Sequence, residues 1–283
     1  LRRPCAAPAS LEALADAAHA SDLEHYVALD ADQGAVHTQR HLAPSTAQMS
    51  MQERATLAWL MMDREIQQNE AYRGAGSTAS VLLLHSLDVP TAPWYTSEYL
   101  AVTTVQLGDT RLVLCDAETG EAIPLTRLHH PDDPIESDRL SRQGAGVLTD
   151  SFGESRFLGT LANTRSFGDT QAKRYGMTAE PEVQTHILQG SRFAFIAGFS
   201  DGIGDVMTDQ ELVDECRYAS HPQQAAERIM KYAEDLGAED NATILCIPLR
   251  GWGAIRGEDR TALLRRDRRL NTDIYRNRRN LCL

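Results

Sequence analysis

The chain is 283 residues long, which is enough for one large domain or two small ones. Apolar residues make up 42% of it and charged residues 24%, ordinary values for a globular protein that give no reason to expect general disorder. The net charge of −12 argues against nucleic acid as the main partner, because phosphate binding needs an excess of cationic side chains.

The five cysteines are odd in number and scattered along the chain. They form no CxxC pair, and no histidine stands at zinc-ligand spacing, so the sequence predicts neither a disulfide framework nor a zinc site. No apolar run approaches the roughly 20 residues of a membrane helix, which predicts a chain without a membrane span. The opening LRRPCAAPAS is either a basic, acid-poor targeting segment or an ordinary terminus.

The first elements expected along the chain are a strand and a helix. The apolar run in HYVALDADQG, residues 25–34, predicts a short strand that breaks at Asp30. Helical periodicity follows over residues 50–69. Ser50 and Glu53 match a capping box there, in which each side chain satisfies a backbone N–H of the first turn.

Three runs rich in leucine and β-branched residues then predict strands at 78–87, 99–107 and 110–116. The last two flank Gly108-Asp109, which predicts a hairpin. From 117 to 190 the chain is rich in Gly, Asp, Pro and Ser, and we expect mostly loop and short helix. A segment of this length without strong periodicity is more often functional than idle.

The last part of the chain alternates strands and helices. It predicts a strand at 192–200, a helix at 208–218 capped by Thr208 with Glu211, a helix from Pro222 to 236 stopped by Gly237, and a strand at 242–249. Beyond 257 the residues are arginine-rich with few apolar ones, which indicates a solvated helix or a mobile extension. We therefore expect one α+β domain on antiparallel sheets over residues 1–256, and an extension over 257–283.

Several aspartates stand at the ends of predicted strands. Asp201 follows the strand at 192–200, Asp240 precedes the last strand, and Asp109 lies at the predicted hairpin. Hard divalent ions prefer oxygen ligands, and a rigid strand end holds a carboxylate well. Each aspartate taken alone is also a common turn residue, so the alternative is a purely structural role.

The order of motifs from about residue 74 to 249 resembles the type 2C family of metal-dependent protein serine/threonine phosphatases. Three of the family's segments are similar to stretches of this chain, namely GAGSTASVLLL, VQLGDTRLVLCDAETGEAIPLT and HHPDDPIESDRLSRQGA. LANTRSFGD and TAEPEV resemble its R-x-x-GD and PE motifs, and FSDGIGDVMTDQEL and EDNATILCI its SDGxWD and DN motifs. The sequences LANTRSFGDTQAKR and GWGAIRGEDR are similar to those of a fungal branch of the family that is associated with mitochondria.

The resemblance implies a central β-sandwich of two antiparallel sheets flanked by helices, in α/β/β/α layers. It also implies two or more Mg²⁺ or Mn²⁺ ions at one end of the sandwich. Asp201 and Asp240 match the acids of the main metal site, and Asp109 and Asp205 match acids of a further, weaker position. Arg165 and Asp169 match a pair that is more structural than catalytic in the family, so for this chain we identify no catalytic or substrate-binding side chain.

The earliest family motifs match poorly here. The arginine that grips the substrate phosphate has only Arg2 and Arg3 as candidates, by position alone. The D-G-H-G motif has YVALDADQG in its place, where Asp30 would be the bridging metal ligand. Ala31 would stand for the glycine, and Asp32 or Gln33 for the histidine that acts as general acid.

Two explanations of this departure stay open. Either the sequence is incomplete near its N-terminus, or the chain is a pseudophosphatase that keeps the fold and binds a partner protein. The main hypothesis is hydrolysis of phosphoserine and phosphothreonine in proteins by a metal-bound hydroxide. We expect a phosphorylated protein as substrate and a mitochondrial location, with the cytoplasm as the alternative; the sequence does not determine an oligomeric state.

Other conspicuous residues have structural interpretations. The HHP segment favours a loop brace at His129 and His130 over substrate contact. Helical spacing favours core positions for Trp59, Met61 and Met62. We expect Trp252 to pack on the sheet, and Cys115 and Cys246 to be inert residues within strands.

Overall fold

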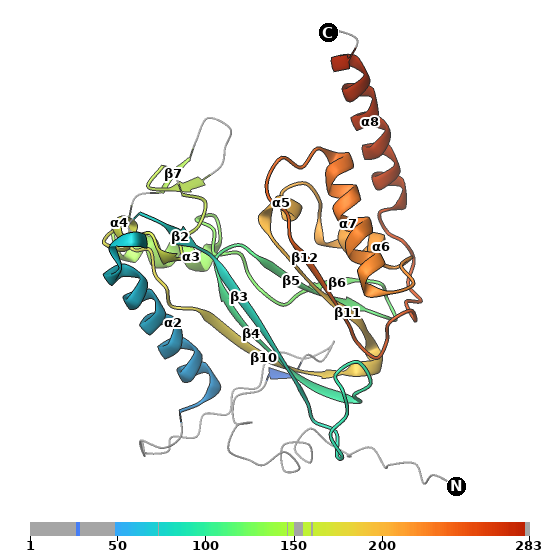
Figure 1. Ribbon diagram of the computed structural model, residues 1–283, viewed down its shortest axis with the longest axis horizontal. Helices are drawn as coiled ribbons and strands as arrows, with labels where there is room; N and C mark the ends of the chain where they lie inside the picture. Colours follow the sequence, from blue (N-terminus) through green and yellow to red (C-terminus); the bar gives the residue numbers. More distant parts are fainter. Residues whose placement is uncertain are drawn as a thin grey trace.

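The computed structural model shows two facing four-stranded β-sheets with helices on their outer sides (Figure 1). One sheet has the strand order β1-β10-β4-β3 and the other the order β12-β11-β5-β6. Every pairing within the two sheets is antiparallel except that of β1 with β10. The structure describes residues 27–28, 49–72, 74–145, 147–149, 155–159 and 161–280.

The strands of both sheets contribute apolar side chains to a core between them. The first sheet consists of β1 (Val27–Ala28), β10 (Glu182–Gln189), β4 (Tyr99–Leu107) and β3 (Ala79–Ser86). The second consists of β12 (Ile244–Pro248), β11 (Phe193–Phe199), β5 (Arg111–Asp116) and β6 (Ala122–Pro124). Leu100, Val102, Leu114, Leu188 and Ile196 are buried together between them, so the core is that of a sandwich.

The long helices begin and end where the capping residues predict. Helix α2 (Met51–Gln68) has the Ser50/Glu53 capping box, and α6 (Asp209–Cys216) has the Thr208/Glu211 box. Helix α7 (Pro222–Leu236) ends at Gly237, whose positive φ completes its C-terminal cap. Helices α6 and α7 cover the second sheet through a core that includes Phe195, Phe199, Leu212, Ile229 and Tyr232.

Short elements lie between the long ones. They are η1 (Glu70–Tyr72), β2 (Gly76–Ser77), α3 (Pro134–Arg142), β7 (Val147–Thr149), β8 (Ser155–Phe157), β9 (Phe167–Gly168), α4 (Thr170–Lys173), η2 (Gly190–Arg192) and α5 (Asp201–Gly204). Strand β2 pairs with β9, and β7 pairs with β8. Of the segment 25–34, where the sequence predicts a short strand, Val27–Ala28 form β1, while the other residues and the opening LRRPCAAPAS lie outside the described residues.

The predicted hairpin at Gly108-Asp109 is wrong, because β4 and β5 belong to different sheets. Strand β4 pairs with β3 and β10, whereas β5 pairs with β6 and β11. The backbone of Gly108 is satisfied by His129 instead, whose Nδ1 accepts from the Gly108 N–H at 2.9 Å. Gly108 and Asp109 therefore form a corner at which the chain crosses from one sheet to the other.

The prediction of mostly loop over 117–190 missed a complete strand. Strand β10 pairs with β4 along its whole length, from Glu182 opposite Gln106 to Gln189 opposite Tyr99. Its sequence EVQTHILQ alternates β-branched with polar residues, and the polar ones hid it from a search for apolar runs. The buried His129 also contacts Glu182, with Nε2 at 3.4 Å from a carboxylate oxygen, so the predicted loop brace is confirmed for His129.

The core positions expected in α2 are only partly correct. The inward face of α2 carries residues at helical spacing, namely Ala55, Trp59, Asp63 and Ile66. The Trp59 ring centroid is 5.8 Å from that of Phe167. Met61 and Met62 lie off this stripe and are 54% and 50% exposed. Trp252 packs on the sheet as expected, with its ring centroid 5.6 Å from that of Phe195. Cys115 and Cys246 lie within strands β5 and β12.

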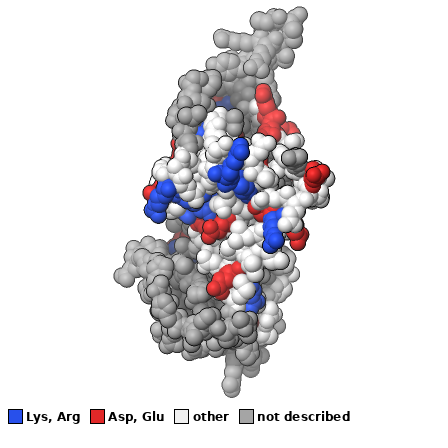
Figure 2. Space-filling model, turned by 90° about the vertical axis from the view of Figure 1, so that its left-hand side faces the viewer, with Lys and Arg blue, Asp and Glu red and all other residues white. Residues whose placement is uncertain are grey.

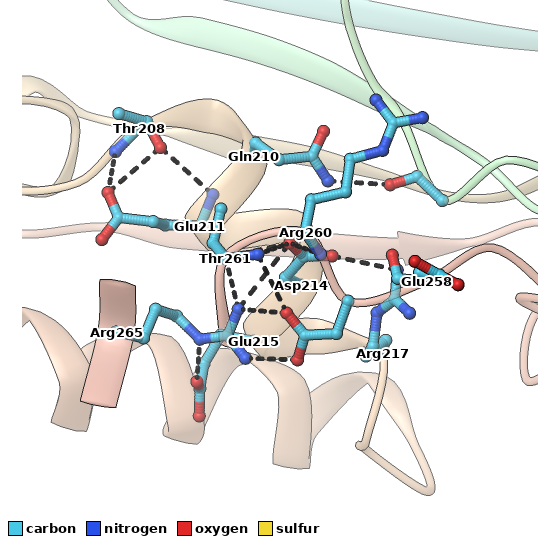
Figure 3. A network of polar contacts seen from close by, with 12 residues as sticks. Thr208, Gln210, Glu211, Asp214, Glu215, Arg217, Glu258, Arg260, Thr261 and Arg265 are labelled. Atoms are coloured by element: carbon cyan, nitrogen blue, oxygen red, sulfur yellow. Dashed lines mark hydrogen bonds and ion pairs between the residues drawn. The ribbon is translucent and has the colours of Figure 1, made fainter. Parts of the chain in front are cut away.

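The arginine-rich tail forms helix α8 (Ala262–Asn280), which lies against α7 (Figure 1). One side of its first turns is packed, since Arg265 is only 4% exposed, whereas the neighbouring Leu263 is 81% exposed. Arg265 donates to Glu215 at 3.1 Å and to Asp259 at 2.8 Å, within the polar network drawn in Figure 3. Paired carboxylates thus replace the apolar contacts that the tail lacks.

On the face shown in Figure 2, arginine and lysine side chains stand beside aspartate and glutamate side chains rather than forming one basic surface. Among the helices that the structure describes, none combines the length and the apolar character that crossing a bilayer would require.

Candidate metal centre

Two of the predicted metal ligands lie at one edge of the second sheet. Strands β11 and β12 are antiparallel neighbours, with Phe199 opposite Ile244. Asp201 begins α5 just after β11, and Asp240 lies in the loop just before β12. The Ser200 N–H donates to the Thr243 carbonyl at 3.1 Å and extends the pairing toward both acids. Adjacent antiparallel strands therefore bring together two residues that are far apart in the sequence.

Gly202 allows the two loops at this edge to touch. A Cβ atom added at Gly202 would lie 2.5 Å from the Asn241 carbonyl oxygen and 3.3 Å from that of Asp240. These atoms belong to the backbone and cannot rotate away. The glycine after Asp201 is thus needed for close approach of the backbone that carries Asp240.

Asp109 reaches the same edge from the corner between the sheets. Arg111 of β5 lies opposite Phe199 of β11, so the start of β5 is next to the end of β11. Asn163 Nδ2 donates to Asp109 Oδ2 at 3.0 Å. Burial raises the pKa of Asp109, and the negative charge of Asp201 raises this pKa further against the opposing effect of Asn163. Two acids that repel each other in this way favour a cation between them.

Asp205 lies one turn after Asp201 and is the C-cap residue of α5. Its backbone N–H donates to the Asp201 carbonyl at 2.8 Å. Asp205 also borders a cavity of about 570 Å³, which Arg111, Asp209 and Arg268 help to line. Asp201 and Asp205 therefore belong to one short helical turn between the sheet edge and this cavity.

The carboxylate oxygens of these aspartates are the type of ligand that a hard divalent cation prefers. Oδ1 of Asp201 accepts from the Gly202 N–H at 2.8 Å, and Oδ1 of Asp240 accepts from the Asn241 N–H at 2.7 Å. Neither carboxylate has an ion-pair partner among the described residues. In the same part of the chain, no three His, Cys, Asp or Glu side chains converge closely enough to hold a metal ion.

The predicted bridging ligand Asp30 lies outside the described residues, together with Arg2, Arg3, Ala31, Asp32 and Gln33. Strand β1 ends two positions before Asp30 and pairs with His186 and Ile187 of β10. Of the predicted metal ligands, the structure therefore describes Asp109, Asp201, Asp205 and Asp240.

A network of buried polar side chains supports the loops around the centre. Arg165 Nε donates to Glu136 at 3.0 Å, and Asp169 accepts from the Ser166 hydroxyl at 2.6 Å. These contacts agree with a structural role for Arg165 and Asp169. Asn163, which donates to Asp109, lies two positions before Arg165 in the same segment.

Sequence reasoning missed two of the supporting residues. Asn163 had no signal except its position within LANTRSFGD. Asp63 of α2 is buried, accepts from the Gly168 N–H at 2.8 Å and pairs with Lys173 at 3.2 Å. A charged residue on the inward stripe of α2 was the available signal for Asp63.

Comparison with known proteins agrees with this fold and these motifs. The profile of the family "Protein phosphatase 2C" matches residues 5–242. Protein phosphatase 2C homolog 4 of Schizosaccharomyces pombe, a fungal relative, is 44% identical over 161 residues, which cover 56% of this chain and 41% of that protein. Protein phosphatase 1K, mitochondrial, of Xenopus laevis is 32% identical over 178 residues, covering 63% and 44%.

The chain thus spans about two fifths of the length of these curated relatives. A phosphatase structure from Toxoplasma gondii has a TM-score of 0.54 at 20% identity, over 69% of this chain and 74% of that chain. This likeness concerns the fold and confirms the expected sandwich of antiparallel sheets flanked by helices. On its motifs, its fold and the match over residues 5–242, the chain belongs to the protein phosphatase 2C family.

Proposed function

We propose that the chain hydrolyses phosphoserine and phosphothreonine in proteins with the help of Mg²⁺ or Mn²⁺. Metal-dependent hydrolysis of phosphoproteins is the general property of its family. The observation that carries the proposal is the packing of the Asp201 turn against the Asp240 loop through Gly202, with Asp109 at the same sheet edge. All three acids come from rigid strand ends, so the fold can hold their negative charges in place for a cation.

In this proposal Asp201, Asp240 and Asp30 would hold the main ions, and Asp109 and Asp205 would hold an ion at a further position. Bound divalent cations lower the pKa of water and neutralise charge on a phosphoryl group. The chain itself holds Asp109 through Asn163 and keeps Asp201 and Asp205 on one turn.

The buried Cys115 has no part in this chemistry. Burial raises the pKa of the Cys115 thiol to about 12, which keeps it protonated and a poor nucleophile. Because this thiol is a poor nucleophile, its burial is consistent with hydrolysis that does not pass through a phosphorylated cysteine.

We further propose that residues 1–256 form the phosphatase domain and that residues 257–283 are an extension docked on it through α8. The substrate would be a phosphorylated protein. The mitochondrial relative supports a mitochondrial location, with the cytoplasm as the alternative. The comparisons lend no support to a silent binding module.

The Asp201→Asn variant tests the proposal. It should lower Mn²⁺-dependent release of phosphate from a phosphopeptide by roughly 100-fold or more, since a direct ligand matters at least as much as its outer partners. Calorimetry should show Mn²⁺ binding to the wild-type chain and its weakening in the variant. Asp267→Asn, at an exposed position of α8, is the matched control and should keep both properties. Undiminished activity of Asp201→Asn would end the metal proposal, and a wild-type chain without Mn²⁺ binding would favour the silent module.

A further inference from the structure

Three arginines on one side of α8 meet the carboxylates of α6. Arg265 and Arg269 both pair with Glu215, at 3.1 Å each. Arg268 pairs with Glu211 at 2.8 Å. Figure 3 shows Arg265 beside the α6 carboxylates, and this row of contacts holds the first turns of α8 on the domain.

Arg268 makes a contact that the other two do not. Its Nη1 donates to both carboxylate oxygens of Glu211 at 2.8 Å, and its Nη2 donates to the carbonyl oxygen of Val206 at 2.6 Å. Glu211 is 0% exposed and is the third residue of α6, where it completes the capping box with Thr208. One guanidinium group therefore joins the start of α6 to the segment that precedes it.

That segment carries the candidate metal ligands. Val206 directly follows Asp205, and its N–H donates to the Ile203 carbonyl at 3.2 Å. Asp205 is in turn bonded to the Asp201 carbonyl. The turn that bears both acids thus ends at the carbonyl that Arg268 holds, and Arg268 and Asp205 line the same cavity.

The chemistry of arginine suits this role. A planar guanidinium holds two acceptors in fixed relative directions, which the single ammonium of lysine cannot do. Its bonds to the buried Glu211 are charge-assisted and strong. Through Arg268, the orientation of the peptide between residues 206 and 207 is therefore fixed relative to the start of α6.

We infer that Arg268 is a positioning residue for the metal centre: it fixes the end of the α5 turn and thereby the direction of Asp205. The inference rests on the proposed function, since it concerns the ion that Asp205 serves. It assigns to the arginine-rich tail a part in cation binding.

The test compares Arg268→Ala with Arg266→Ala, because Arg266 is an exposed neighbour on the same helix. Calorimetric titration of the full chain with Mn²⁺ should show a dissociation constant raised roughly tenfold in Arg268→Ala, the usual effect of losing a partner outside the ligand shell. Arg268→Lys should fall between wild type and alanine. Hydrogen exchange of the 205–207 amides should accelerate in Arg268→Ala and stay unchanged in Arg266→Ala.

A merely structural role gives a different result. It would lower the thermal midpoint and the fraction of binding-competent molecules, but leave the Mn²⁺ dissociation constant of the folded fraction unchanged. That outcome, with normal Mn²⁺ binding by the wild type, would overturn the inference and leave the proposed function standing. A wild-type chain that binds no Mn²⁺ would overturn both.

Discussion

Glu136 shows how single side chains keep the loops beside the candidate metal centre in place. It is 1% exposed and accepts bonds from Arg165 at 3.0 Å, Arg139 at 2.8 Å and Thr164 at 2.5 Å. Burial by itself raises the pKa of Glu136, but the bonds from Arg165, Thr164 and Arg139 outweigh burial and lower it to about 2. The ionised carboxylate is therefore the form that the fold requires.

Replacing this carboxylate should be costly at neutral pH. Glu136→Gln leaves two arginines without their buried partner, and we expect a loss of about 3–5 kcal/mol in the free energy of unfolding, measured by urea denaturation at pH 7. Glu180→Gln, at an exposed glutamate, is the control and should change stability little. A loss in Glu136→Gln no larger than that of the control would contradict the network's importance.

The stability from Glu136 should also depend on pH. Its pKa is about 2 in the folded chain against an ordinary 4.5, so the folded state binds the proton less tightly than the unfolded state. The contribution is fully present above pH 4.5 and is lost as the pH falls from there toward 2. Urea denaturation across this range should show the wild-type advantage over Glu136→Gln shrinking; an advantage that grows on acidification would refute the assignment.

At the scale of elements, the junction between β11, α5 and the loop before β12 depends on a residue without a side chain. Gly202→Ala would place a methyl group 2.5 Å from the Asn241 carbonyl oxygen. We expect it to lower the free energy of unfolding by about 1–3 kcal/mol, as overpacking does. Calorimetry should also show weaker Mn²⁺ binding, because the loops of Asp201 and Asp240 are forced apart.

Gly204→Ala in the same turn is the matched control. A methyl group there would lie 3.1 Å from Arg111 Nε, part of a side chain that can shift. Its effect on stability should stay within about 1 kcal/mol, since alanine also favours the helix. Equal losses in the two variants would mean that close approach to Asn241 is not what the turn requires.

At the scale of the whole molecule, the tail is held on the domain by charge. Arg265→Leu would remove the buried cation that Glu215 and Asp259 share, and we expect a loss of about 3–5 kcal/mol in the free energy of unfolding, measured by urea denaturation. Limited proteolysis should then cleave the chain within residues 257–283 faster than in wild type. Arg266→Leu on the exposed side of α8 should change neither measurement; protection of the tail in Arg265→Leu would show that other contacts hold it.

Local sequence signals predicted most of the individual elements. The boxes Ser50/Glu53 and Thr208/Glu211 and the stop at Gly237 involve residues within a few positions of one another, and all three are confirmed. The supporting residues of the site were beyond such signals. Asn163 meets Asp109 across 54 positions of sequence, and Asp63 meets Gly168 across 105.

The sequence by itself determined where most strands and helices form and which aspartates stand at strand ends, because backbone propensity, capping and strand breaks are encoded by neighbouring residues. Only the tertiary structure decided that β4 and β5 enter different sheets, that Met61 and Met62 face outward, and that Arg265 is buried. These outcomes depend on the partner that each surface finds. A strand, a helical stripe or an arginine is compatible with several partners until distant segments of the chain pack together.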